Sequence, residues 1–245
     1  MKYKASFPLS RAFSLVELLV VISIIAIIAG FAVPAVTTMI RGSQLTQGSQ
    51  MIADQVSLAR QTALGRNRSV DVRFYKFGDP ETPGEDPTNP ETGSFRAMQV
   101  FEVLENGATL PMGPIQRLPV NVVMNEGKLS TILNADFLGR TLVTKPTNSD
   151  PEMPDASVVR HYYYFVLRFL PDGSTDLPTV AVKKGEDATK AVSPDSWYIT
   201  LHGTHVSKSP SVPDGKVDTV PDNFFTLQID PTTGSSRAYR PNVGN

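Results

Sequence analysis

The chain of 245 residues contains no cysteine. This absence excludes disulfide bonds, thiol nucleophiles and cysteine-ligated metal sites, so the fold must be held together by its apolar core alone. A chain of this size buries enough apolar surface to fold without such cross-links. The net charge of −1 provides no general attraction to nucleic acid or to anionic lipid.

Catalytic signatures are also scarce. The three histidines are His161, His202 and His205, and the stretch from 202 to 205 lacks the glutamate and the helical spacing of a zinc protease motif. The sequence has no Gly-rich phosphate loop at a strand-to-helix junction and no Gly-x-Ser-x-Gly elbow. We therefore expect no enzyme activity, no cofactor and no metal site.

The chain does contain a long apolar run from Leu15 to Val36, in which Glu17 and Ser23 are the only strongly polar side chains. The length matches the roughly 20 residues with which a helix crosses a bilayer, so we expect a transmembrane part at about 15–36. A carboxylate inside such a segment is costly and indicates a function.

The residues before this run set its orientation, because Lys2, Lys4 and Arg11 precede it without an acidic residue. Positive charge tends to stay in the cytoplasm, which predicts an exported body. Two ordinary interpretations are a cleaved secretory signal, with a small-x-small site at 30–32, and a plain uncleaved anchor. Neither interpretation gives Glu17 a role.

A third interpretation comes from resemblance. The run from Ala12 through Phe13 and Glu17 to Leu18, Ala-Phe-Ser-Leu-Val-Glu-Leu, resembles the processing site of type IV prepilins and of type II secretion pseudopilins. The resemblance implies cleavage between Ala12 and Phe13 by a prepilin peptidase, followed by N-methylation of Phe13. The sequence departs from the family at Ala12, where glycine is usual.

In this family the carboxylate at the position of Glu17 serves assembly. The resemblance implies that the Phe13 amine of a neighbouring subunit neutralises Glu17 and fixes the axial stagger between subunits, which removes the cost of an isolated charge. An alternative is that Glu17 extends toward the lipid headgroups and needs no partner. Pro34 lies inside the predicted helix, lacks a hydrogen-bond donor and predicts a kink or local melting at 30–34.

Beyond the apolar run, the helical pattern continues to a stop signal at Gly65. One apolar stripe recurs at helical spacing; its members are Leu45, Ile52, Val56, Ala59 and Ala63. The body is expected to be β-rich, with the α+β architecture of one long helix on an antiparallel sheet. The strands are expected at 69–75, 98–104, 120–124, 162–170, 197–201 and 224–229.

The segment 79–93 is rich in proline and in acidic residues. We expect an exposed, solvated loop. Calcium binding is the alternative, but the spacing of the acids matches no EF-hand-like loop.

Motifs in the body resemble the GspH/FimT-like minor pseudopilins. The run Leu58-Ala59-Arg60-Gln61-Thr62-Ala63-Leu64 and the hairpin Arg168-Phe169-Leu170-Pro171-Asp172-Gly173 carry this likeness. A narrower likeness, to the Verru_Chthon cassette protein D family, comes from 41–47 and 72–75. FimT-like proteins bind DNA through basic residues near the C-terminus, so Arg237 and Arg240 are candidate DNA contacts for an alternative role in DNA uptake. Two arginines neutralise few phosphates, and we expect solvated tail residues instead.

The resemblance implies a leader at 1–12, a long helix at 13–66 and an exported β-rich domain at 67–245. The implied function is that of a minor pseudopilin in a short type II secretion or type IV pilus-like filament for protein export. The expected partners are the inner membrane, the prepilin peptidase/methyltransferase, other pilins or pseudopilins and the secretion or pilus assembly machinery. The N-terminus is expected in the cytoplasm and the body in the periplasm of a bacterium, and nucleic acid is not an expected partner.

Overall fold

The computed structural model describes residues 14–126, 129–134, 162–178, 197–204 and 223–240. The chain divides into two compact units, Met1–Arg41 and Gly42–Asn245. This division falls within the long helix α1, Leu15–Arg66, so the second half of α1 belongs to the same unit as the strands.

In the first unit, α1 continues as an α-helix through position 34. The expected local melting around Pro34 therefore does not occur, whereas the kink stays a prediction. Among the residues that the structure describes, no helix is found with both the length and the apolar character needed to cross a bilayer. The transmembrane part at about 15–36 stays a prediction.

In the second unit, α1 presents its apolar stripe to the body. All five residues of the predicted stripe, Leu45 to Ala63, are at most 3% exposed, which confirms the helical period deduced from the sequence. The helix ends one residue beyond Gly65. Asn67 adopts a left-handed φ of 52° and the Arg68 N–H donates to the Ala63 carbonyl at 3.3 Å, as in a Schellman C-cap.

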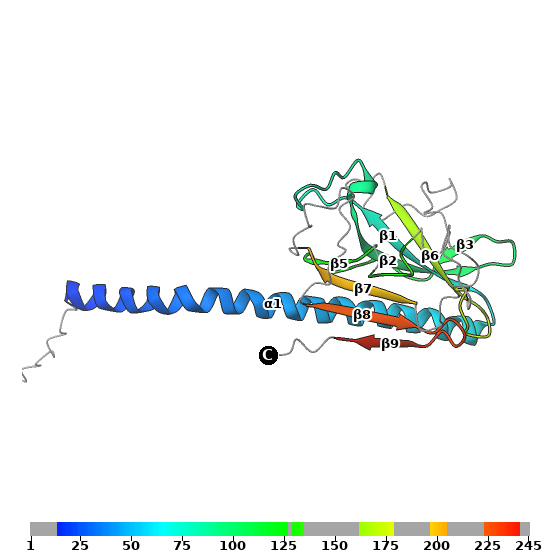
Figure 1. Cartoon of the computed structure of the whole chain (residues 1–245), viewed down its shortest axis with the longest axis horizontal. Coiled ribbons are helices and arrows are strands. Elements are labelled where there is room, and N and C mark those ends of the chain that lie inside the picture. The colour runs from blue at the N-terminus through cyan, green and yellow to red at the C-terminus, as the bar shows by residue number, and fades with distance from the viewer. Residues whose placement is uncertain (1–13, 127–128, 135–161, 179–196, 205–222, 241–245) are drawn as a thin grey trace, which may run out of the picture. The chain divides into compact units, whose positions relative to one another are not determined.

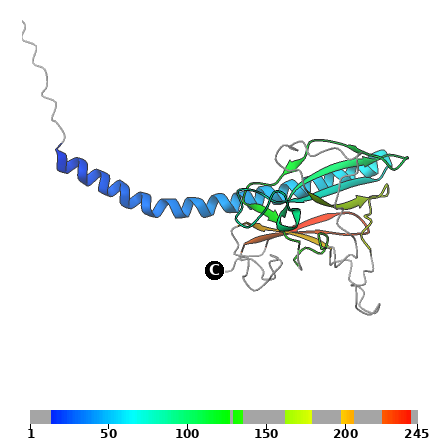
Figure 2. The same ribbon diagram turned by 90° about the horizontal axis from the view of Figure 1, so that it is seen from above.

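A single antiparallel sheet accompanies the helix (Figures 1 and 2). Its strands follow the order β6-β1-β2-β5-β7-β8-β9, with β3 and β4 also paired to β2. The strands are β1 Val70–Phe77, β2 Ser94–Val103, β3 Thr109–Pro111, β4 Gln116–Arg117, β5 Val122–Met124, β6 Tyr163–Phe169, β7 Tyr198–Gly203, β8 Phe224–Ile229 and β9 Ser236–Tyr239. One long helix followed by an antiparallel sheet confirms the α+β class.

The main core lies between the stripe of α1 and the helix-facing side of the sheet. Trp197, Phe74 and Phe95 are among its largest fully buried side chains. The Trp197 indole N–H donates to the Pro178 carbonyl at 3.0 Å, so this large side chain is buried without an unsatisfied donor.

Two turns from distant parts of the sheet meet beside the end of α1; we call their contact the seam. The Thr175 N–H donates to the Pro231 carbonyl at 2.8 Å, and the Arg60 Nε donates to the Thr233 carbonyl at 2.7 Å. Gly234, at a φ of 64°, lies so close to Gly173 that a Cβ on it would be 2.1 Å from the Gly173 carbonyl oxygen. The seam thus joins the segment after β6 to the turn between β8 and β9.

Six strands form where the sequence predicts strands, and three do not appear in the prediction. The run 224–229 matches β8, and the other five predictions overlap β1, β2, β5, β6 and β7. The missed strands β3, β4 and β9 have two to four residues, too few to show a period of two.

Candidate functional site

The N-terminal part of α1 carries an apolar surface that no other described residue of this chain covers. Its large apolar side chains are all exposed, from 79% at Leu15 to 44% at Val21. They are Leu15, Val16, Leu18, Leu19, Val20, Val21, Ile22, Ile24, Ile25, Ile27 and Ile28. Because they follow one another almost without interruption, they surround the helix, and such a helix is normally covered on all sides by other molecules.

Glu17 lies in the first turn of α1 and is exposed. A carboxylate there interacts favourably with the positive end of the helix dipole. The Leu18 N–H donates to the Ser14 carbonyl at 3.1 Å, which continues helical hydrogen bonding to the residue before α1. The other polar side chain, Ser23, donates to the Leu19 carbonyl at 2.8 Å and is satisfied within the helix. Of these two polar side chains, Glu17 is therefore the one that is available to a polar partner.

The predicted processing site, Ala12 and Phe13, lies outside the described residues. Its cleavage and methylation stay predictions, as does pairing of Glu17 with a neighbouring amine.

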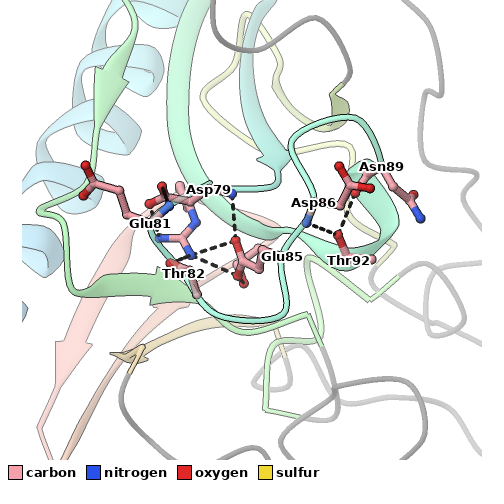
Figure 3. A network of polar contacts seen from close by, with 9 residues as sticks. Asp79, Glu81, Thr82, Glu85, Asp86, Asn89 and Thr92 are labelled. Carbon is pink, nitrogen blue, oxygen red and sulfur yellow. Dashed lines mark hydrogen bonds and ion pairs between the residues drawn. The ribbon is translucent and has the colours of Figure 1, made fainter.

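The acidic segment 79–93 is an exposed loop at Glu81, Asp86 and Glu91, as expected, but not at Glu85 (Figure 3). The Glu85 side chain is 2% exposed, and the Arg96 side chain of β2 is 7% exposed. Arg96 Nη2 lies 2.9 Å from each Glu85 oxygen, and Arg96 Nη1 lies 3.5 Å from Asp79 Oδ2. A buried ion pair therefore attaches the loop to the sheet, and the expectation of solvated acids is wrong for Glu85.

Other acids in this loop bind its own backbone. Asp79 Oδ1 accepts the Glu81 N–H at 3.0 Å, and Asp86 Oδ1 accepts the Thr88 N–H at 2.8 Å. Asn89 caps a short 3-10 helix, Pro90–Thr92, by accepting the Glu91 N–H. These are the Asx turns that Asp and Asn favour in loops. Within the described part of the chain, no group of three or more His, Asp or Glu side chains is placed to hold a metal ion.

The candidate DNA contacts lie at the edge of the sheet. Arg237 is in β9, opposite Gln228 of β8, and Arg240 follows the strand. Both side chains are exposed, and Arg240 Nη2 is 3.4 Å from Asn223 Oδ1. The tail therefore forms a strand at Arg237, which was not predicted, although the sequence Pro-Thr-Thr-Gly at 231–234 is typical of a turn and follows a predicted strand. His202 is buried in β7, while His161 and His205 lie outside the described residues.

The face of the sheet opposite the main core contains charges that no sequence motif indicated. Arg168 donates to both oxygens of Asp71, at 2.6 and 2.9 Å, and these hydrogen bonds raise the pKa of Arg168 above its ordinary value despite partial burial. The Arg73 guanidinium carbon lies 4.1 Å from the centre of the Phe101 ring and 4.9 Å from that of Tyr164. These contacts stabilise buried charges within the sheet.

Comparison with known proteins identifies the N-terminal segment. Residues 8–33 match the family model of the prokaryotic N-terminal methylation motif, which confirms the prepilin-type motif deduced from the sequence. The match includes Ala12, Phe13, Glu17 and the first turns of α1. No curated protein matches the chain.

Two solved structures of the minor pseudopilin EpsH from the type II secretion system of Vibrio cholerae resemble this chain. One has a TM-score of 0.37 at 8% identity, over 81% of this chain and 98% of the other. The second has a TM-score of 0.37 at 10% identity, over 83% of this chain and 98% of the other.

Proposed function

We propose that this chain is a structural, non-enzymatic subunit of a type IV pilus-like or type II secretion filament. The observation that carries the proposal is the methylation motif at 8–33, continuous with a helix whose apolar surface is exposed and whose first turn contains Glu17. An apolar helix of this kind needs neighbours, and a carboxylate within it needs a cation.

The proposed sequence of events begins at the bacterial inner membrane, with which the N-terminal part associates. The prepilin peptidase cleaves between Ala12 and Phe13 on the cytoplasmic side, and the new amine of Phe13 is methylated. The second unit lies in the periplasm. In the filament, the amine of Phe13 from one subunit neutralises Glu17 of the next, while the apolar side chains of α1 pack against those of neighbouring helices.

We infer the role of a minor subunit, which caps or primes a short filament that serves protein export. The body motifs that resemble GspH/FimT-like proteins support this inference. In this role the chain contacts other pseudopilins and the assembly machinery, and its mechanism is assembly without covalent chemistry after processing.

The first test is mass spectrometry of the N-terminal peptide of the protein extracted from its native membrane. The expected peptide begins at an N-methylated Phe13. An intact Met1 would contradict processing, and a start near Val33 would indicate an ordinary secreted protein.

The second test replaces Glu17 by alanine, with Ser23→Ala as a matched control on the same helix. We expect Glu17→Ala to be processed normally but to lose incorporation into filaments, because the amine of the neighbour no longer meets a carboxylate. Ser23→Ala should incorporate normally, since its hydroxyl bonds only within its own helix. Incorporation is measured by sedimentation and immunoblotting of sheared filaments. Normal incorporation of Glu17→Ala would refute the role of this carboxylate.

A further inference from the structure

Strand β9 is an edge of the sheet. It pairs with β8 on one side, and no described strand pairs with its other side (Figure 1). Such an edge presents backbone groups that can bind another extended chain.

The ladder between β8 and β9 shows which groups these are. The Asp230 N–H donates to the Ser235 carbonyl at 2.9 Å, and the register then pairs Gln228 with Arg237 and Thr226 with Tyr239. Because hydrogen-bonded and non-hydrogen-bonded pairs alternate in antiparallel ladders, Arg237 and Tyr239 direct their N–H and C=O groups toward β8. The N–H and C=O groups of Ser236 and Ala238 therefore point away from the sheet.

The side chains of this edge are exposed and basic. Arg237, Ala238, Tyr239 and Arg240 are all exposed, and no carboxylate lies on the strand. Arg237 is near the Asp230 carboxylate of the turn, and Arg240 is near the Asn223 amide. Neither arginine forms an ion pair within the described part of the chain. A second copy of β9 added to this edge would bring arginines together, which opposes self-pairing.

We propose that β9 binds an extended, acidic peptide segment of a partner protein by strand addition. The backbone of such a segment supplies alternating N–H and C=O groups that complement those of Ser236 and Ala238. Its acidic side chains complement Arg237 and Arg240, and Tyr239 provides apolar contact area. The acidic segment 79–93 of a second copy is not the occupant, because its Asx turns and 3-10 helix prevent an extended conformation.

The outward backbone groups also distinguish a peptide from a nucleic acid. Two exposed arginines are attractive to phosphates, but the outward carbonyl oxygens of Ser236 and Ala238 repel an anionic backbone. The backbone of a peptide satisfies both the donors and the acceptors of the edge, whereas the phosphate backbone of a DNA strand offers no donor to the acceptors. Peptide binding at β9 does not depend on N-terminal processing. Peptide binding can therefore be refuted while the proposed filament function holds, and the filament function can be refuted while peptide binding holds.

The test uses the full chain in mild detergent and a fluorescein-labelled octapeptide of alternating glutamate and valine. Binding is measured by fluorescence anisotropy, with a lysine–valine octapeptide as the control. We expect the glutamate peptide to bind at least about tenfold more tightly than the lysine peptide, because opposite charges on adjacent strands are favourable and like charges are not.

Ala238→Pro separates strand addition from simple charge attraction. Proline at 238 removes an outward N–H and leaves the hydrogen bonds to β8 intact, as is tolerated on edge strands. We expect it to weaken binding about tenfold relative to Ala238→Ser, which retains the N–H. Arg237→Gln should also weaken binding of the glutamate peptide and reduce its salt dependence.

Equal affinities of Ala238→Pro and Ala238→Ser would overturn the proposal. A second measurement does not depend on the folding of a variant: a glutamate–valine peptide N-methylated at every residue has no N–H donor along either side and should not bind the wild-type chain. Binding as tight as that of the unmodified peptide would overturn strand addition. A 12-nucleotide single-stranded DNA is the third ligand. If it binds more tightly than the acidic peptide, and if Ala238→Pro does not change its affinity, the partner of β9 is a nucleic acid and the proposal is overturned.

Discussion

Replacing Glu85 by glutamine tests whether a buried charge holds the loop 79–93 against the sheet. The Glu85 carboxylate accepts hydrogen bonds from Arg96 Nη2, from the Asp79 N–H at 3.0 Å and from the Ser94 hydroxyl at 2.8 Å. Glutamine keeps the size of the side chain but removes its charge. It also replaces one acceptor oxygen by an NH2 donor. Because the amide is neutral, the buried Arg96 guanidinium loses its closest compensating charge.

The expected cost follows from the burial of both side chains. Removing one partner of a buried ion pair costs about 3–5 kcal/mol, because the other charge stays buried without compensation. Here Asp79 remains 3.5 Å from Arg96 and compensates part of that charge, so we expect a loss of about 2–3 kcal/mol. For a domain of this size, each kcal/mol lowers Tm by about 2–4 °C, which gives a decrease of roughly 4–12 °C.

The assay is thermal unfolding of the full chain in mild detergent, followed by circular dichroism. Hydrogen exchange of 79–93 is measured in parallel, because local opening of the loop need not change the global transition. Glu81→Gln, at an exposed position of the same loop, is the matched control and should lie within about 0.5 kcal/mol of the wild type.

A double variant sharpens this test. Glu85→Leu combined with Arg96→Met removes both charges and should recover much of the stability lost in Glu85→Gln. If Glu85→Gln changes neither Tm nor the exchange of the loop, the argument that this ion pair attaches the loop is refuted.

Two other predictions concern the turn between β8 and β9. Gly234→Ala places a Cβ against the Gly173 carbonyl at a positive φ and should cost about 3 kcal/mol in urea unfolding. Gly113→Ala, where a Cβ meets nothing within 4 Å, is the control. Equal urea midpoints for the two variants would contradict the close contact between Gly234 and Gly173. Burial raises the pKa of Asp230, but hydrogen bonds from Thr232 and Thr233 and the charge of Arg237 outweigh it, so the pKa lies below its ordinary value. The resulting stability is present above the unfolded pKa of about 4 and is lost as pH falls through the folded pKa. NMR titration of the Thr232 and Thr233 amides should therefore show loss of the turn in acid in the wild type but not in Asp230→Asn, and identical titrations would contradict this assignment.

Local patterns predicted the long elements of this fold. The buried stripe of α1 could be deduced because five apolar residues from Leu45 to Ala63 recur at helical spacing, and packing then follows that period. Strand β8 was predicted to the residue because the run 224–229, in which four of six residues favour strands, precedes a turn. The methylation motif was recognised because its residues are adjacent in the sequence.

Features that depend on distant partners were not predicted. The composition of 79–93 suggests solvent exposure, and only the position of Arg96 on β2 shows that Glu85 is buried. Asp71 and Arg73 have the spacing of an outward-facing strand surface, yet both faces of β1 are buried, since Arg168 and the rings of Phe101 and Tyr164 surround these charges. The end of α1 was assigned to Gly65, whereas Asn67 supplies the left-handed residue.

The seam also determines the order in which the body becomes complete. Thr175 and Pro231 are 56 positions apart in the chain, and closing so long a loop costs conformational entropy before its contact contributes any stability. The end of α1 acquires its contacts at Thr233 only after β8 and β9 are in place. A nascent body that has reached β6 but not β8 therefore lacks the core residues of β7 and β8, such as Ile199 and Leu227, and the apolar groups that these strands will cover stay open to other chains.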